Sequence, residues 1–147
     1  MKRSVEAAYP LAVGVLFGAA WWCAGPALPI DEKEFLAAAI SLGAVLTGFI
    51  ATAKAILATL PSESVMRQLR ASGYVNDLVD YLAQALYGCL LFSVISLAGF
   101  FFLAKDRTPP LNEMYGGLWV GLGIFALLSF HRVSSLLFKI IKSEPVA

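Results

Sequence analysis

The sequence is poor in charged residues and in the side chains that most enzymes use for chemistry. Only 14% of its 147 residues are charged, whereas about a quarter are charged in a typical soluble domain. There is one histidine, His131, and there are two cysteines, Cys23 and Cys89. The sequence contains no zinc-ligand spacing, no phosphate-binding glycine loop and no Ser-His-Asp arrangement. We therefore expect a protein that is not an enzyme and that uses no metal or cofactor.

Long apolar runs are what the sequence has in excess. The chain is 59% hydrophobic and has a mean hydropathy of +0.77. A helix of about 20 apolar residues crosses a hydrocarbon core about 30 Å thick. The runs therefore predict an all-α, polytopic membrane protein with a single transmembrane domain over residues 1–147. Its four transmembrane helices are expected at about residues 7–24, 35–57, 82–104 and 114–131.

The distribution of lysine and arginine predicts the orientation of these helices. Basic residues gather before the first span, between the second and third spans, and after the fourth span. Because cytoplasmic loops of membrane proteins carry an excess of such residues, we expect both termini to be cytoplasmic. The net charge of only +1 gives no reason to expect direct binding of nucleic acid. The lipid bilayer is therefore the expected surrounding partner.

Two cytoplasmic segments are expected to contact lipid headgroups or a protein partner. Residues 61–74 form a predicted elbow with a short interfacial helix between the second and third spans. Residues 132–147 form a predicted basic amphipathic tail. We expect the basic side chains of these segments to contact a cytoplasmic protein or the headgroups: Arg67, Arg70, Arg132, Lys139 and Lys142.

Glycines in two of the spans predict close contacts between helices. Gly14 and Gly18 form one GxxxG motif, and Gly117 and Gly121 form a second. Small residues at this spacing allow two membrane helices to approach closely. We expect helix packing at these four positions. Because little of the chain lies outside the bilayer, we also expect self-association into a homo-oligomer. A flexible gate is the alternative for the glycine-rich run GGLWVGLG.

Polar side chains within the spans leave two interpretations open. Ser41, Thr47 and Thr52 lie on a small and weakly polar stripe of the second span. This stripe predicts tight helix packing or, alternatively, the lining of a water-filled path. Gln84 is suited to a hydrogen bond that joins either two helices or two protomers.

Lys54 lies near the cytoplasmic end of the second span. Its ammonium group is expected either to extend to the headgroups or to form a salt bridge. The candidate partners are Asp77 and Asp80, which enter the membrane at the same level.

The layout of the chain resembles a known family. The features that carry the resemblance are four spans with both ends inside, a basic elbow that ends in LRASGYVNDL, and a tail SFHRVSSLLFKII. In this layout the chain resembles the small four-helix inner-membrane proteins of phage defence, the family of RexB-like proteins and of KwaA of the Kiwa system. The resemblance implies a bacterial inner-membrane protein that forms a homo-oligomer, with a tetramer favoured. It implies no catalytic residues.

Three functional hypotheses follow. The favoured one is an anti-phage defence sensor or anchor in the membrane that recruits or activates a cytoplasmic effector protein; the basic elbow, the basic tail and the small-residue helix faces support it. The alternative is an ion-conducting, membrane-depolarising channel of an abortive-infection or exclusion system, which the Ser, Thr and Gly stripes indicate. The third is a holin or an accessory subunit of a membrane complex.

Overall fold

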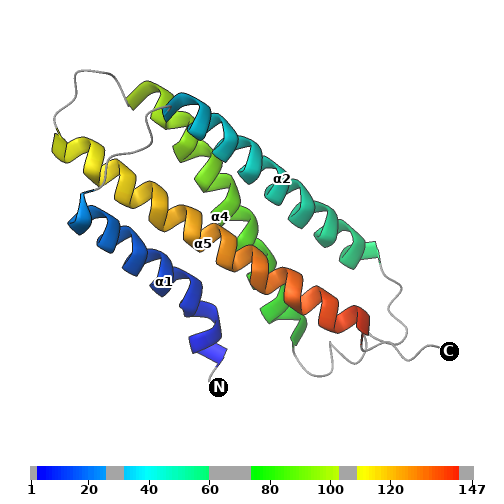
Figure 1. Cartoon of the computed structure of the whole chain (residues 1–147). Coiled ribbons are helices and arrows are strands. Elements are labelled where there is room, and N and C mark those ends of the chain that lie inside the picture. The colour runs from blue at the N-terminus through cyan, green and yellow to red at the C-terminus, as the bar shows by residue number, and fades with distance from the viewer. Residues whose placement is uncertain (1–2, 26–31, 60–73, 103–108, 143–147) are drawn as a thin grey trace.

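The computed structural model describes residues 3–25, 32–59, 74–102 and 109–142 of the chain. In these residues it contains four α-helices: α1 (Arg3–Ala24), α2 (Glu32–Thr59), α4 (Tyr74–Phe102) and α5 (Pro109–Lys142) (Figure 1). The predicted all-α fold is therefore confirmed. The interfacial helix predicted between the second and third spans lies outside the described residues.

Local sequence explains two of the helix ends. α5 begins with Pro109 and Pro110, whose missing N–H groups cost nothing in the first turn of a helix. After α1, Gly25 has a φ of +59°, in the left-handed region that glycine adopts without a steric penalty. The N–H of Gly25 donates a hydrogen bond of 3.0 Å to the carbonyl of Trp21, which closes the last turn of α1.

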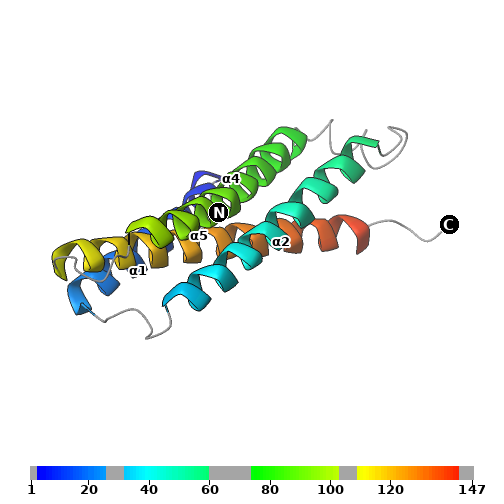
Figure 2. The same ribbon diagram turned by 90° about the horizontal axis from the view of Figure 1, so that it is seen from above.

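The four helices form an antiparallel bundle in which α4 and α5 lie between α1 and α2 (Figure 1), and Figure 2 shows the same bundle from above. α1 packs against α5, and α2 packs against α4. α1 begins and α5 ends at the same end of the bundle, where α2 also ends and α4 begins (Figure 1). This up-and-down order is the one that four successive crossings of a membrane require.

Three of the helices are long and apolar enough to cross a membrane. The candidate spans are Lys33–Leu57, Asp77–Phe101 and Glu113–Lys139. The apolar part of α1, Ala8–Ala24, is shorter and lies near the lower limit of about 17 residues for a spanning helix. The multi-pass membrane character predicted from the sequence is therefore supported for three helices, and the fourth crossing stays a prediction.

The surface of the bundle is apolar in a way that suits lipid. Leu16 on α1, Val45 on α2 and Phe101 on α4 are each more than two-thirds exposed. Soluble monomers rarely expose extended apolar patches of this kind. In a bilayer the same side chains lie against acyl chains, and their exposure costs nothing.

α1 and α5 meet through the two GxxxG motifs. A Cβ atom added to Gly14 would lie 2.7 Å from the carbonyl oxygen of Gly121, and one added to Gly18 would lie 2.7 Å from that of Gly117. In the reverse direction, a Cβ on Gly117 or Gly121 would lie 2.9 Å from the oxygen of its partner. The four glycines therefore form one contact, the glycine seam, in which the backbones touch. Because the seam joins two helices of one chain, an oligomer must use other surfaces.

α2 packs against α4 by a different pattern, with one glycine facing side chains. A Cβ on Gly43 would overlap the hydroxyl of Ser93 and lie 3.1 Å from the carbonyl oxygen of Cys89. Ile50 on α2 and Ala85 on α4 are completely buried in the same interface. The core of the protein thus follows the α2–α4 interface and continues to α5 through Cys89, whose thiol lies 4.0 Å from the carbonyl oxygen of Ala126.

Two glycine-to-alanine substitutions are expected to have opposite effects on stability. Gly18→Ala places a methyl group against the backbone of α5 and should lower the free energy of unfolding by about 1–3 kcal/mol. Gly48→Ala is the matched control, because a Cβ there has no neighbour within 4 Å. It should leave the free energy of unfolding unchanged or raise it by up to about 1 kcal/mol. Thermal unfolding in detergent micelles measures both, and equal effects would contradict the glycine seam.

Candidate functional site

A buried arginine is the most unusual feature of the described residues. Arg132 lies on α5 inside the candidate span Glu113–Lys139 and is only 8% exposed. It lies about 15 Å before the end of α5 at Lys142. A buried charged side chain is costly unless groups inside the protein pair with it or accept its hydrogen bonds.

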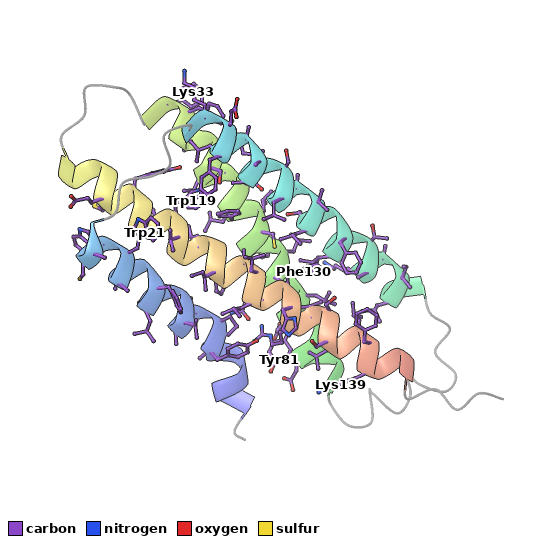
Figure 3. The ribbon with its side chains drawn as sticks, viewed as in Figure 1. Trp21, Lys33, Tyr81, Trp119, Phe130 and Lys139 are labelled. Atoms are coloured by element: carbon purple, nitrogen blue, oxygen red, sulfur yellow. The ribbon has the colours of Figure 1, made fainter. Side chains whose placement is uncertain are left out.

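Side chains of α1 and α4 surround the Arg132 guanidinium. Its Nη2 group donates a hydrogen bond to Oε1 of Gln84 on α4. The guanidinium carbon lies 4.0 Å from the ring centroid of Tyr81 on α4 and 6.0 Å from that of Tyr9 on α1. Figure 3 shows Tyr81 beside α5, toward the end of the bundle where α1 begins. We call these four residues the arginine cluster.

The cluster replaces water around the charge with an amide oxygen and aromatic faces. A hydrogen bond to a charged group contributes about 1.5–3 kcal/mol, and a cation–π contact contributes about 0.5–2 kcal/mol. Tyr81 is 6% exposed, so the ring that faces the guanidinium is itself buried in the bundle. Because Arg132 contacts both α1 and α4, a displacement of either helix relative to α5 weakens a contact to a buried charge. The cluster is therefore suited to coupling helix positions.

Arg132 is placed differently from the sequence-based expectation. We expected it to contact headgroups or a cytoplasmic partner, but its side chain is buried in the interface between α4 and α5. The physical reason is that Gln84 and Tyr81 lie opposite it inside the bundle, where Gln84 accepts a hydrogen bond from the guanidinium and the Tyr81 ring faces it. The neighbouring His131 is exposed and takes the outward position on the helix.

The other basic residues of the predicted contact surface have mixed positions. Lys139 is exposed near the end of α5, beside the exposed Phe138. Lys142 is the last residue of α5. Arg67 and Arg70 lie outside the described residues. The predicted contact surface therefore stays a prediction. Arg132 does not belong to it, because its side chain lies inside the bundle.

The candidate salt bridge of Lys54 is compatible with the arrangement of α2 and α4. Their antiparallel packing brings the end of α2 that carries Lys54 to the end of α4 that carries Asp77 and Asp80. Lys54 and Asp80 are exposed, and Asp77 is half-buried. Asp77 and Asp80 belong to the helical candidate span Asp77–Phe101. The pairing itself stays a prediction.

A second polar contact ties α4 to α5 near the opposite end. The hydroxyl of Tyr115 donates a hydrogen bond of 2.8 Å to the carbonyl of Ile95. The indole N–H of Trp119 donates one of 2.9 Å to the hydroxyl of Ser96, which in turn donates to the carbonyl of Phe92. The ring of Trp119 also lies 5.2 Å from that of Phe35 on α2, centroid to centroid. This contact holds α2, α4 and α5 together without a charge.

Sequence reasoning did not single out Tyr9, Tyr81, Tyr115 or Trp119. Each is an aromatic side chain with a polar tip or a face that can take a cation, and each looked like part of an apolar run. The available signal was that a buried tyrosine or tryptophan usually has a hydrogen-bond partner. Which partner it has depends on the neighbouring helix.

Three hydroxyl groups of α2, those of Ser41, Thr47 and Thr52, bond within their own helix. Ser41, Thr47 and Thr52 donate hydrogen bonds of 3.0, 2.7 and 2.9 Å to carbonyls four residues earlier in α2. Such bonds satisfy the hydroxyls locally. Ser41 and Thr52 are exposed, so they lie on the surface of the bundle and line no interior path. This arrangement weakens the channel hypothesis for a single chain.

Among the described residues, no group of three or more His, Cys, Asp or Glu side chains is placed to hold a metal ion. Comparisons of the chain with protein-family models, curated proteins and solved structures found no match. The geometry of the bundle is therefore the basis on which a function can be proposed.

Removing the acceptor from the arginine cluster is expected to destabilise the protein. Gln84→Leu should lower the free energy of unfolding by about 1.5–3 kcal/mol, because the buried guanidinium loses a hydrogen-bond acceptor. In the double variant with Arg132→Leu, the total loss should be smaller than the sum of the two single losses by about 1 kcal/mol or more. Denaturant unfolding in micelles measures all three. Tyr87→Leu, at an exposed position of the same helix, is the control and should change stability by less than about 0.5 kcal/mol. Additive losses would contradict the coupling.

Proposed function

We propose that the protein is a non-enzymatic, multi-pass membrane protein that acts as a sensor or anchor for a cytoplasmic effector protein. The observation that carries this proposal is the arginine cluster, which joins α1, α4 and α5 inside the bundle. A buried charge with contacts on three helices makes their relative positions interdependent. That property suits a protein that passes a disturbance of the bilayer to a partner, as in the phage-defence proteins that the layout resembles.

α5 is the element that would carry such a signal. It is a single helix of 34 residues, about 50 Å long, whereas the hydrocarbon core is about 30 Å thick. It therefore extends beyond the core by several turns. If both termini are cytoplasmic, the extension includes the exposed Phe138 and Lys139. A shift of α1 or α4 against Arg132 then changes the position of this extension at the membrane surface.

The proposed location is the bacterial inner membrane, with both termini in the cytoplasm. The excess of lysine and arginine at the termini and in the connection between α2 and α4 supports this orientation. The shared end of the bundle at which α1 begins and α5 ends is consistent with it. The proposed homo-oligomer, with a tetramer favoured, must form through surfaces other than the glycine seam.

An ion-conducting channel is the second candidate. The exposure of Ser41 and Thr52 on α2 favours it, because these hydroxyls would meet if several chains placed their α2 helices around one axis. Their hydrogen bonds to the helix backbone leave the oxygen lone pairs available to ions or water. In this alternative the depolarising activity requires the oligomer.

Charge reversal at the two ends of the bundle tests whether the protein recruits a cytoplasmic partner through the end of α5. In cells that express the protein with a proximity-labelling tag, Lys139→Glu with Lys142→Glu should reduce labelling of the effector at least tenfold. Lys33→Glu, at an exposed position at the opposite end, is the matched control and should leave labelling unchanged. Identical labelling patterns in all variants would contradict recruitment through the end of α5.

Ion flux separates the two candidates. Sealed liposomes that contain the purified protein should keep a potassium gradient if the protein is a sensor or anchor. Sustained flux that Ser41→Leu with Thr52→Leu abolishes would support the channel instead.

A further inference from the structure

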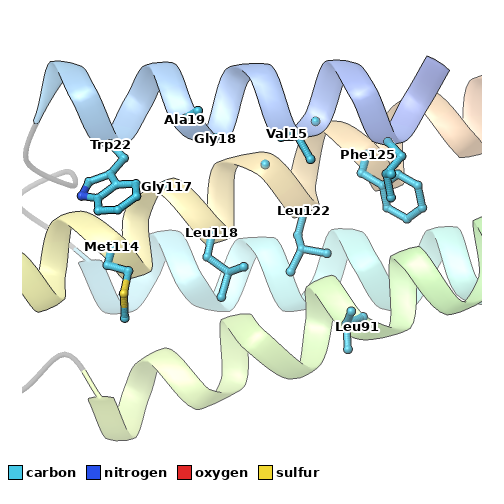
Figure 4. A pocket seen from close by; sticks show the side chains of 13 residues that line it. Val15, Gly18, Ala19, Trp22, Leu91, Met114, Gly117, Leu118, Leu122 and Phe125 are labelled. Carbon is cyan, nitrogen blue, oxygen red and sulfur yellow. The ribbon is translucent and has the colours of Figure 1, made fainter. Parts of the chain in front are cut away.

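An apolar groove runs along α5 between α1 and α4. Its volume is about 460 Å³. α1 and α5 form its walls, and Leu91 is the contribution of α4 (Figure 4). The glycine seam forms part of its lining, because the close contact of α1 with α5 leaves α1 apart from α4. The lining consists of apolar side chains and glycine, so the groove offers nothing that would orient a polar ligand along its length.

The length of the groove matches one leaflet of a bilayer. It extends from Trp22 and Met114 at one end to Leu11 and Phe125 at the other. At 1.5 Å per residue, residues 11 to 22 of α1 cover about 16 Å. Half of a hydrocarbon core about 30 Å thick is about 15 Å. The groove therefore reaches from the level of the interface to about the middle of the membrane.

The width of the groove decides between a lipid chain and a helix. A volume of 460 Å³ over about 16 Å corresponds to a mean cross-section of about 29 Å². A helix with its side chains is about 10–12 Å in diameter and needs about 80 Å² or more. A second copy of the chain or a helix of another protein therefore does not fit within the groove. A single hydrocarbon chain does.

The interfacial end of the groove carries a negative charge. Glu113 precedes the groove residue Met114 on α5 and is half-buried. Its carboxylate lies 3.7 Å from the position that a Cβ on Gly25 would occupy, just beyond the end of α1. Trp22 is 56% exposed at the same end, as is typical of tryptophan at the level of lipid headgroups. A cationic group at this level would be attracted to Glu113, and an anionic one repelled.

We propose that the groove binds one acyl chain of a phospholipid whose headgroup bears an ammonium group, as in phosphatidylethanolamine. The chain fills the groove from Trp22 toward Leu11, and the ammonium lies near the carboxylate of Glu113. Lipids with a purely anionic headgroup and free fatty acids are disfavoured, because each places a negative charge at the same level with no ammonium group to balance it. The bound lipid would support α1 on the side where α4 does not contact it.

Native mass spectrometry with a groove-filling variant tests the proposal. The protein is reconstituted in vesicles of equal parts phosphatidylethanolamine and phosphatidylglycerol and then extracted in mild detergent. The wild type should retain one phosphatidylethanolamine. Leu118→Trp fills the groove and should reduce this retention at least tenfold. Leu127→Trp, the same change on α5 outside the groove, is the control and should retain the lipid. Equal retention by both variants would overturn the proposal, as would a change of oligomeric state with Leu118→Trp.

Two further measurements test the headgroup preference and keep the proposal testable if Leu118→Trp fails to fold. Glu113→Gln should keep one bound lipid but lose the preference for phosphatidylethanolamine over phosphatidylglycerol; an unchanged preference would overturn the role of Glu113. In the wild type, phosphatidylethanolamine with a photoreactive acyl chain should label Leu118, Leu122 and Leu91 of the groove. Labelling spread evenly over the exposed faces of α2 and α5 would overturn the site.

Discussion

The bundle depends on direct contact between helix backbones at the glycine seam. Lipid is as apolar as the side chains, so burial of apolar surface does not drive membrane helices together, and close packing must do so. Gly14 and Gly18 bring α1 within contact distance of Gly117 and Gly121 on α5. This contact fixes the position of α1 on the outer side of α5. The groove beside α1 remains open on the side of α4, where α1 makes few contacts.

Polar groups obey a second constraint, since a polar group away from water is costly unless it finds a partner inside the protein. The hydroxyls of α2 use the carbonyls of their own helix. Trp119 and Tyr115 use groups of α4. Arg132 uses Gln84 and the faces of Tyr81 and Tyr9. Of these three sets, only the last contains a charged side chain, and its contacts join α1, α4 and α5. The functional proposal therefore depends on it.

Much of the fold was predictable, and the candidate site was not. The long apolar runs indicated a helix at each of the four places because hydropathy is read along one chain without reference to neighbours. The GxxxG spacing indicated close packing for the same reason. The helices extend beyond the predicted spans, and the largest difference is in α5. Arg132 was assigned outward because it follows a span and begins a basic stripe with Lys139 and Lys142. That assignment failed because the side chains opposite Arg132, Gln84 and Tyr81, lie about 50 residues away in the sequence.

The sequence by itself determined that this protein is helical, multi-pass and suited to a bilayer, since composition and periodicity carry that information locally. It also indicated, through the two GxxxG motifs, that the helix faces with glycine would pack closely against other helices. Only the tertiary structure decided that the two glycine motifs meet each other within one chain, that Arg132 lies inside the bundle, and that a groove as long as one leaflet remains beside α1. These outcomes depend on which helix faces meet in the antiparallel arrangement, and the spacing of residues within any one helix does not specify its neighbour.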